Sequence, residues 1–202
     1  MQLSDIRTEI RTRMNVGTTD ANISNSVLTT LINAALRHIS VQYDWPWLEV
    51  EATANTVAGT ETITLASNVR KVTHMYHEYH ELLYRQFRDR PLFYGLTGPP
   101  VAFSEQAGVY YVWPTPNAVY TVSYGYILDK EPALSADSDK PLVPDWAISL
   151  VITQACILVA RRLRDRDTER GFYAEYRDLL QTMTDNIRQV TLGHRPRRVG
   201  NR

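Results

Sequence analysis

The stretch AISLVITQACILVA, residues 147–160, decides the fold, because it is the longest apolar run in the chain. Its 14 residues, with Ser149, Thr153 and Gln154 among them, are too few to span a bilayer and are typical of a buried helix. Pro144 and Asp145 precede the run, as they do at many helix starts. The sequence therefore predicts a helix over 144–164 that needs cover on every side, which favours contact with a neighbouring subunit.

Three further helices are predicted around this one. Residues 4–14 and 167–190 each place apolar side chains on one face at helical spacing. Residues 22–43 show the strongest helical spacing, and Pro46 ends that pattern because proline cannot continue the hydrogen-bond ladder. The apolar positions of this helix are Val27, Leu28, Leu31, Ile32, Ala35, Leu36, Ile39 and Tyr43.

Between the second and third helices, from residue 47 to 128, the apolar pattern changes to a period of two. Strands are predicted near 50–54, 62–65, 69–76 and 119–128, and a hairpin over 101–113 has its turn at 106–108. Residues 82–100, rich in Gly and Pro towards their end, fit a long loop. The sequence thus predicts an α+β protein, a four-helix bundle with a β-rich insertion between helices two and three and an extended basic C-terminal tail.

The predicted domains follow from this order. Residues 1–46 and 129–192 form a helical domain, residues 47–128 the β-rich insertion, and residues 193–202 the tail. Gly193, Pro196 and Gly200 keep the tail from being helical. It contains no acid, and the rest of the chain has 18 basic and 22 acidic residues, a net charge of −4. The basic tail residues and their proline neighbour are Arg195, Pro196, Arg197, Arg198 and Arg202.

Composition excludes several classes of protein. The 202 residues carry a formal net charge of +0, so the whole-chain charge gives no case for a nucleic-acid binder or a membrane-surface protein. The single cysteine excludes an intrachain disulfide framework and multi-cysteine zinc modules. No apolar leader segment opens the chain, so no secretory signal is expected. Nineteen of the 22 basic residues are Arg, which suits protein interfaces as well as a GC-rich coding sequence.

The sequence holds no catalytic signature. There is no phosphate-binding G-x-x-x-x-G-K-[ST], no G-x-G-x-x-G and no G-x-S-x-G motif. Cys156 lies inside the apolar helix, where a thiol acts as a small hydrophobe. His74, His77, His80, Glu78 and Glu81 could hold a metal, but the spacing is one residue short of H-E-x-x-H, and surface histidines of a hairpin explain them better. We therefore expect no enzyme activity, no metal and no cofactor.

A mixed-charge run, RRLRDRDTER, joins the third and fourth predicted helices at residues 161–170. Its simplest interpretation is a solvated turn with weak surface ion pairs. The alternative is a set of complementary charges across a subunit boundary. The candidate interface residues are Arg161, Arg162, Arg164, Asp165, Asp167 and Glu169.

Four motifs in this layout resemble the head-to-tail connector, or adaptor, proteins of tailed bacteriophages, particularly the podophage tail-tubular-protein-A-like form. The resemblance covers most of the chain. Where related phage proteins often have Pro before a Ser or Asp in the second motif, this chain has Ala66. The motifs are LINAALRHISVQYDWPW at 31–47, ITLASNVRKV at 63–72, VYYVWPTP at 109–116 and LVPDWAI at 142–148.

The resemblance implies a non-enzymatic homo-oligomeric ring of the virion, usually of twelve copies, bound beneath the portal protein. The helical domain would form the ring, and the insertion would face the downstream tail or nozzle protein. The tail at 193–202 would dock on the portal, where its arginines suit acidic grooves. DNA would pass through the lumen only as a non-specific passenger, and no membrane is involved. Before assembly the protein would lie in the host cytoplasm.

Three other functions are weighed against this one. A tail terminator or gatekeeper ring would also lack catalysis. A DNA-binding regulator would use the turn between the first two helices, with Arg7, Arg11, Arg13 and Arg37 on phosphates. A metal hydrolase would use the histidines at 74–80, the weakest of the three alternatives.

Overall fold

The computed structural model describes residues 1–18 and 20–193. The chain divides into two compact units, and each is described by itself. Met1–Gln42 and Glu131–Arg202 form the first, which we call the helical unit; Tyr43–Lys130 forms the second, the β unit. The predicted domains, with the tail at 193–202 as a separate segment, and the roles assigned to them stay predictions.

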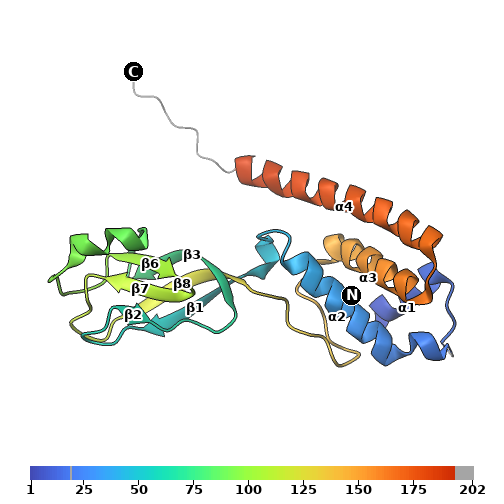
Figure 1. The fold of residues 1–202 in the computed structure, drawn as a ribbon, viewed down its shortest axis with the longest axis horizontal. Coiled ribbons are helices and arrows are strands. Elements are labelled where there is room, and N and C mark those ends of the chain that lie inside the picture. Colours follow the sequence, from blue (N-terminus) through green and yellow to red (C-terminus); the bar gives the residue numbers. More distant parts are fainter. Residues whose placement is uncertain (19, 194–202) are drawn as a thin grey trace, which may run out of the picture. The chain divides into compact units, whose positions relative to one another are not determined.

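The helical unit contains four α-helices and two short 3₁₀-helices within its described residues (Figure 1). Their starts follow from local chemistry, because side-chain oxygens there accept backbone N–H groups that lack helical partners. Ser24 accepts from the N–H of Val27, and Gln2 and Asp5 form a capping box. The elements are α1 (Leu3–Met14), η1 (Ala21–Ile23), α2 (Asn25–Ser40), η4 (Asp145–Ala147), α3 (Ile148–Leu163) and α4 (Arg166–Gly193).

Helix α3 is the centre of the helical unit, and eleven of its sixteen residues are buried. Together with η4 it forms a 19-residue stretch, Asp145–Leu163, that by length and composition alone could cross a membrane. However, 67% of its apolar window is buried inside the protein, as in the core helix of a soluble domain. The prediction that the run 147–160 forms a buried helix is confirmed.

The prediction of a four-helix bundle is wrong. In such a bundle each helix packs against two neighbours around a shared core. Here α1, α2 and α4 each pack on α3, and α4 reaches α1 and the end of α2 through individual side chains, such as the Arg13–Glu175 ion pair at 3.0 Å. The structure is an α+β protein in which three helices pack on one central helix, and the strands form two separate sheets.

The β unit consists of two four-stranded sheets, ordered β1-β8-β3-β4 and β2-β7-β6-β5. All pairings between these strands are antiparallel except that of β5 with β6, and an isolated parallel bridge joins Thr97 to Thr115. The predicted hairpin is confirmed as β6–β7, with Ala107 and Gly108 at positive φ in its turn. The elements are η2 (Pro46–Leu48), β1 (Glu49–Asn55), β2 (Thr62–Ile63), β3 (Val69–His77), β4 (His80–Glu81), β5 (Leu83–Tyr84), η3 (Phe87–Phe93), β6 (Ala102–Gln106), β7 (Val109–Trp113) and β8 (Thr121–Leu128).

Residues 82–100, which fit a long loop by sequence, are ordered by aromatic packing. The segment forms β5 and then η3, whose Phe93 stacks on the buried Trp113 of β7 at 5.3 Å between ring centroids. Phe87 lies 4.8 Å from the ring of Tyr111 on the same strand. Aromatic pairs of this kind bury large areas, so η3 serves as a cover for one face of the second sheet.

Candidate functional site

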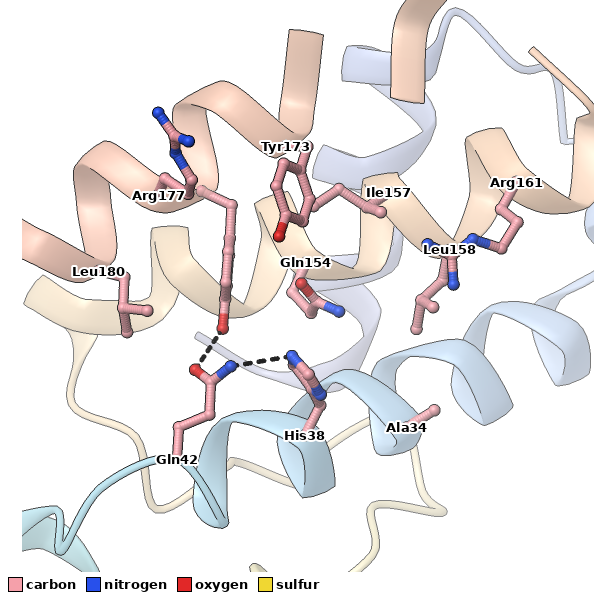
Figure 2. Close-up of a pocket in the computed structure, with 11 residues that line it drawn as sticks. Ala34, His38, Gln42, Gln154, Ile157, Leu158, Arg161, Tyr173, Arg177 and Leu180 are labelled. Atoms are coloured by element: carbon pink, nitrogen blue, oxygen red, sulfur yellow. Dashed lines mark hydrogen bonds between the residues drawn. The ribbon is translucent and has the colours of Figure 1, made fainter. Parts of the chain in front are cut away.

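A groove on the helical unit is lined by residues of α2, α3 and α4 together with Gln42 (Figure 2). It arises because α2 and α4 both pack on α3 without packing closely on each other. Its volume is about 450 Å³. The floor is formed by Gln154, Ile157 and Leu158 of α3, and Leu180 of α4 borders one end.

Two hydrogen bonds cross one end of this groove. The Tyr176 hydroxyl of α4 donates to Oε1 of Gln42 at 2.7 Å, and Nε2 of Gln42 lies 3.0 Å from Nε2 of His38 (Figure 2). Tyr176 is 4% exposed, and this partly buried bond joins α4 to Gln42, just beyond the end of α2. These two hydrogen bonds therefore connect α4 and α2 across this end of the groove.

The borders of the groove are basic and aromatic. Arg161 and Arg177 are exposed on its borders, Tyr173 is 55% exposed, and the lining holds no carboxylate. Arg161 is already paired with Glu169, with guanidinium-to-carboxylate distances of 2.9 and 3.0 Å. Aromatic and arginine side chains are enriched at protein interfaces. The groove thus has the chemistry of a protein-binding surface, and its lining has no paired nucleophile and base.

The predicted interface residues at 161–169 lie at the junction of α3 and α4, and most are engaged within the chain. Arg164 ends α3 in the left-handed conformation, with φ 61°. Nε of Arg162 donates to the carbonyl of Asn22 at 3.0 Å. Asp165 accepts from the backbone N–H and the hydroxyl of Thr168, which lowers the pKa of its carboxyl. Asp167 is 3.8 Å from Arg170. Their role between subunits stays a prediction.

The predicted tail residues Arg195, Pro196, Arg197, Arg198 and Arg202 lie outside the described residues. Their role on the portal stays a prediction, and nothing in the described structure bears on it.

The histidines at 74, 77 and 80 do not converge. Nε2 of His74 is 3.9 Å from Glu51 of β1, whereas Nδ1 of His77 is 3.2 Å from the carbonyl oxygen of Thr121. His80 pairs with His77 across the β3–β4 turn. Within residues 1–18 and 20–193 no group of three His, Cys, Asp or Glu side chains is placed to hold a metal ion.

Several other residues singled out from the sequence are buried. Cys156 is 0% exposed, and burial raises the pKa of its thiol to about 12. Arg7 and Arg11 are 8% and 9% exposed. Arg7 binds Thr29 and Asp137, and Arg11 binds the carbonyls of Gly17 and Ile23, so neither guanidinium faces a phosphate backbone.

One unusual group was missed by sequence reasoning. Glu131 is 7% exposed, and its Oε1 accepts a hydrogen bond from the N–H of Leu142 at 2.5 Å. Its Oε2 is buried, and no hydrogen-bond partner for it lies among the described residues. Burial raises the pKa of this carboxyl to about 7, against the opposing effect of the N–H groups of Leu142 and Val143. A single acid in a polar connection gave no sequence signal of burial.

Together, the fold and this groove leave a surface whose aromatic and arginine side chains suit contact with other proteins. In a comparison with protein families, the family model of the SU10 adaptor protein matches residues 1–200. The chain therefore belongs to the SU10 adaptor protein family. A comparison with curated proteins found no match.

Membership in this family establishes the broad function. The protein is a bacteriophage head-to-tail adaptor, a virion component from a family of structural, non-enzymatic proteins. Such adaptors interact with other virion proteins, such as the portal and the tail. The predicted resemblance to phage adaptors is confirmed at this level.

Proposed function

We propose that this protein forms a ring, of twelve copies, beneath the portal at the capsid vertex, and links the capsid to the tail. The family match over residues 1–200 is the observation that carries the proposal. The finer likeness is to the podophage tail-tubular-protein-A-like form. Identical copies joined head to tail close into a ring when each repeats the same rotation.

The proposal assigns a separate role to each part of the chain. The helical unit forms the ring, because its groove and the exposed α3–α4 junction offer surfaces for a neighbouring copy. The β unit faces the downstream tail component, and residues 193–202 dock on the portal. The division of the chain into two compact units supports this separation of roles.

The ring would also form part of the conduit for DNA ejection. A chain with a formal net charge of +0 has little overall electrostatic attraction for DNA phosphates. This suits a conduit, because DNA must pass through it with only weak, non-specific contact. The engagement of Arg7 and Arg11 inside the helical unit weighs against the sequence-specific DNA-binding alternative.

Electron microscopy of the protein mixed with portal-bearing, DNA-filled heads tests this function. A ring stacked beneath the portal, with its symmetry measured directly, is the expected result. Density further down the tail would favour a terminator or gatekeeper ring instead. Heads without added density, in the presence of a folded monomer, would contradict the proposal.

A further inference from the structure

The β unit carries an exposed surface with the composition of a protein interface. Seven of the sixteen exposed large apolar side chains in the described residues lie between residues 79 and 101. Leu92, Tyr94 and Tyr84 are 71%, 63% and 61% exposed. Exposed apolar side chains that gather in one segment suit an interaction surface, and tyrosine and arginine are enriched at protein interfaces.

This surface is also basic. Residues 82–101 contain three arginines and one acid. Arg90 is used within the unit, where its Nε donates to Glu61 at 2.8 Å. Arg85 and Arg88 are exposed, and within the described residues no hydrogen bond or ion pair engages either guanidinium. We call β5, η3 and these side chains the β5–η3 surface; it would suit a partner that presents carboxylates.

Two acidic side chains are carried by β1, the strand at the opposite border of the same unit. Glu49 and Glu51 are exposed on β1, where Glu49 accepts a hydrogen bond from the hydroxyl of Thr73 at 2.8 Å and Glu51 lies 3.9 Å from the imidazole of His74. Both carboxylates therefore lie over the face of the first sheet beside its β1 border. Strand β1 is seven residues long and pairs only with β8 among the described strands, so its other edge has free backbone N–H and C=O groups. Open edges of this length are templates for pairing with another chain.

Sheet topology explains why the two surfaces lie apart. In the two sheet orders β1 and β2 are the first strands, whereas β4 and β5 are the last. Only Leu82 separates β4 from β5, so both sheets have these strands on one border and β1 and β2 on the other. Figure 1 shows this arrangement within the β unit, with β1 and β2 along one side and the green segment of η3 along the other.

We infer that the β5–η3 surface of one copy binds the β1 edge of the next copy. Complementary charges on opposite borders of one unit produce a heterologous contact, and such contacts close into rings. The contact rests on the proposed ring and adds to it a second lateral interface, outside the helical unit. Arg85 and Arg88 would face Glu49 and Glu51 of the neighbour, with Leu92 and Tyr94 supplying apolar area.

A charge swap in the full-length protein tests this contact. The basic-side variant carries Arg85→Glu and Arg88→Glu, the acidic-side variant carries Glu49→Lys and Glu51→Lys, and a third variant combines all four changes. Asp129→Lys, an exposed reversal at the end of β8, is the matched control. The readout is the fraction of portal-bearing heads with a ring in electron micrographs, after circular dichroism has shown that each variant is folded.

Each two-site variant should reduce ring occupancy about tenfold, because like charges would face one another in every interface, while the four-site variant should recover to within about twofold of wild type. Leu92→Ser changes no charge and should also reduce occupancy.

Unchanged rings in every variant would overturn the contact and leave the proposed ring itself unaffected. Rings that form but no longer recruit the next tail protein would also overturn it, by assigning the surface to that partner. Absence of any wild-type ring would refute the proposed function and this contact with it.

Discussion

The imidazole of His74 on β3 lies directly over the backbone of Gly125 on β8. A Cβ built on Gly125 would lie 2.7 Å from both ring nitrogens, closer than real Cβ contacts come. The two residues are register partners in the first sheet. The glycine is therefore needed for the space it leaves, and the histidine fills that space as a packing residue.

The first prediction concerns this pair. Gly125→Ala should lower the free energy of unfolding by about 1–3 kcal/mol, because overpacking forces the ring or the strands to shift. Urea denaturation followed by tryptophan fluorescence measures the change, since three of the four tryptophans lie in the β unit. His74→Ala combined with Gly125→Ala should recover most of the loss. A loss that is equal with and without His74 would contradict the steric explanation.

The second prediction concerns Glu131. Because the pKa of its carboxyl is about 7 in the folded protein and lower when unfolded, the folded state binds the proton more tightly. Its contribution to stability is fully present below about pH 4.5 and is lost as pH rises towards and through 7, by a total on the order of 3 kcal/mol. Glu131→Gln should flatten this dependence. Urea denaturation followed by circular dichroism at 222 nm, at several pH values from 5 to 8, measures it, and equal slopes for both proteins would refute the assignment.

The third prediction concerns Arg7, which joins three segments of the helical unit. Its guanidinium donates to Thr29 at 2.7 and 3.0 Å and to Asp137 at 2.6 Å. Arg7→Ala should lower the free energy of unfolding by about 1–3 kcal/mol, because these partners lose a charged donor. Arg7→Lys should restore only part of the loss, since a lysine lacks the planar fork.

The matched control for this prediction is Arg170→Ala. Arg170 has an 80% exposed side chain and lies 3.8 Å from Asp167, so its removal should change stability by less than about 0.5 kcal/mol. Thermal or chemical denaturation compares the two variants under one condition. Equal effects at both positions would show that the buried guanidinium of Arg7 contributes no more to the free energy of unfolding than an exposed one.

The fourth prediction concerns residues 193–202 and rests on the proposed function. A chain lacking them should keep its helical circular dichroism and lose attachment to portal-bearing heads. A second variant, with Arg195, Arg197, Arg198 and Arg202 all changed to Gln, keeps the length and removes the charge. It should attach more weakly than wild type, with the difference shrinking at high salt. Normal attachment by the truncated chain, measured by co-sedimentation with heads, would overturn the docking role.

The sequence predicted those features that depend on local pattern. Helical spacing and capping residues such as Ser24 placed the helices, and the apolar run at 147–160 indicated the central helix. The four-helix bundle was wrong because periodicity shows that α4 has an apolar face and cannot show how much of its length a neighbour covers. Likewise, Phe87 and Phe93 pack on β7, about 20 residues further on, so no local signal revealed that residues 82–100 are ordered.

The candidate site was predicted less completely, for a related reason. The charges at 161–169 fitted either a solvated turn or an interface, and most of their partners are local, such as Glu169 for Arg161, whereas the partner of Arg162, Asn22, lies far away in sequence. The groove depends on how two helices pack on a third, and the burial of Glu131 depends on a long-range contact with Leu142. Neither leaves a pattern in a single sequence.

The bond between the N–H of Glu131 and the hydroxyl of Ser40, at 3.3 Å, joins the points where the chain leaves and re-enters the helical unit. A short turn from Gln42 to Glu131 could therefore replace the whole β unit and leave every helix in place. In evolutionary terms, the β unit is therefore a segment that can be exchanged as a whole. Recombination between phage genes at these two neighbouring points could exchange one β unit for another while the helical scaffold is inherited unchanged.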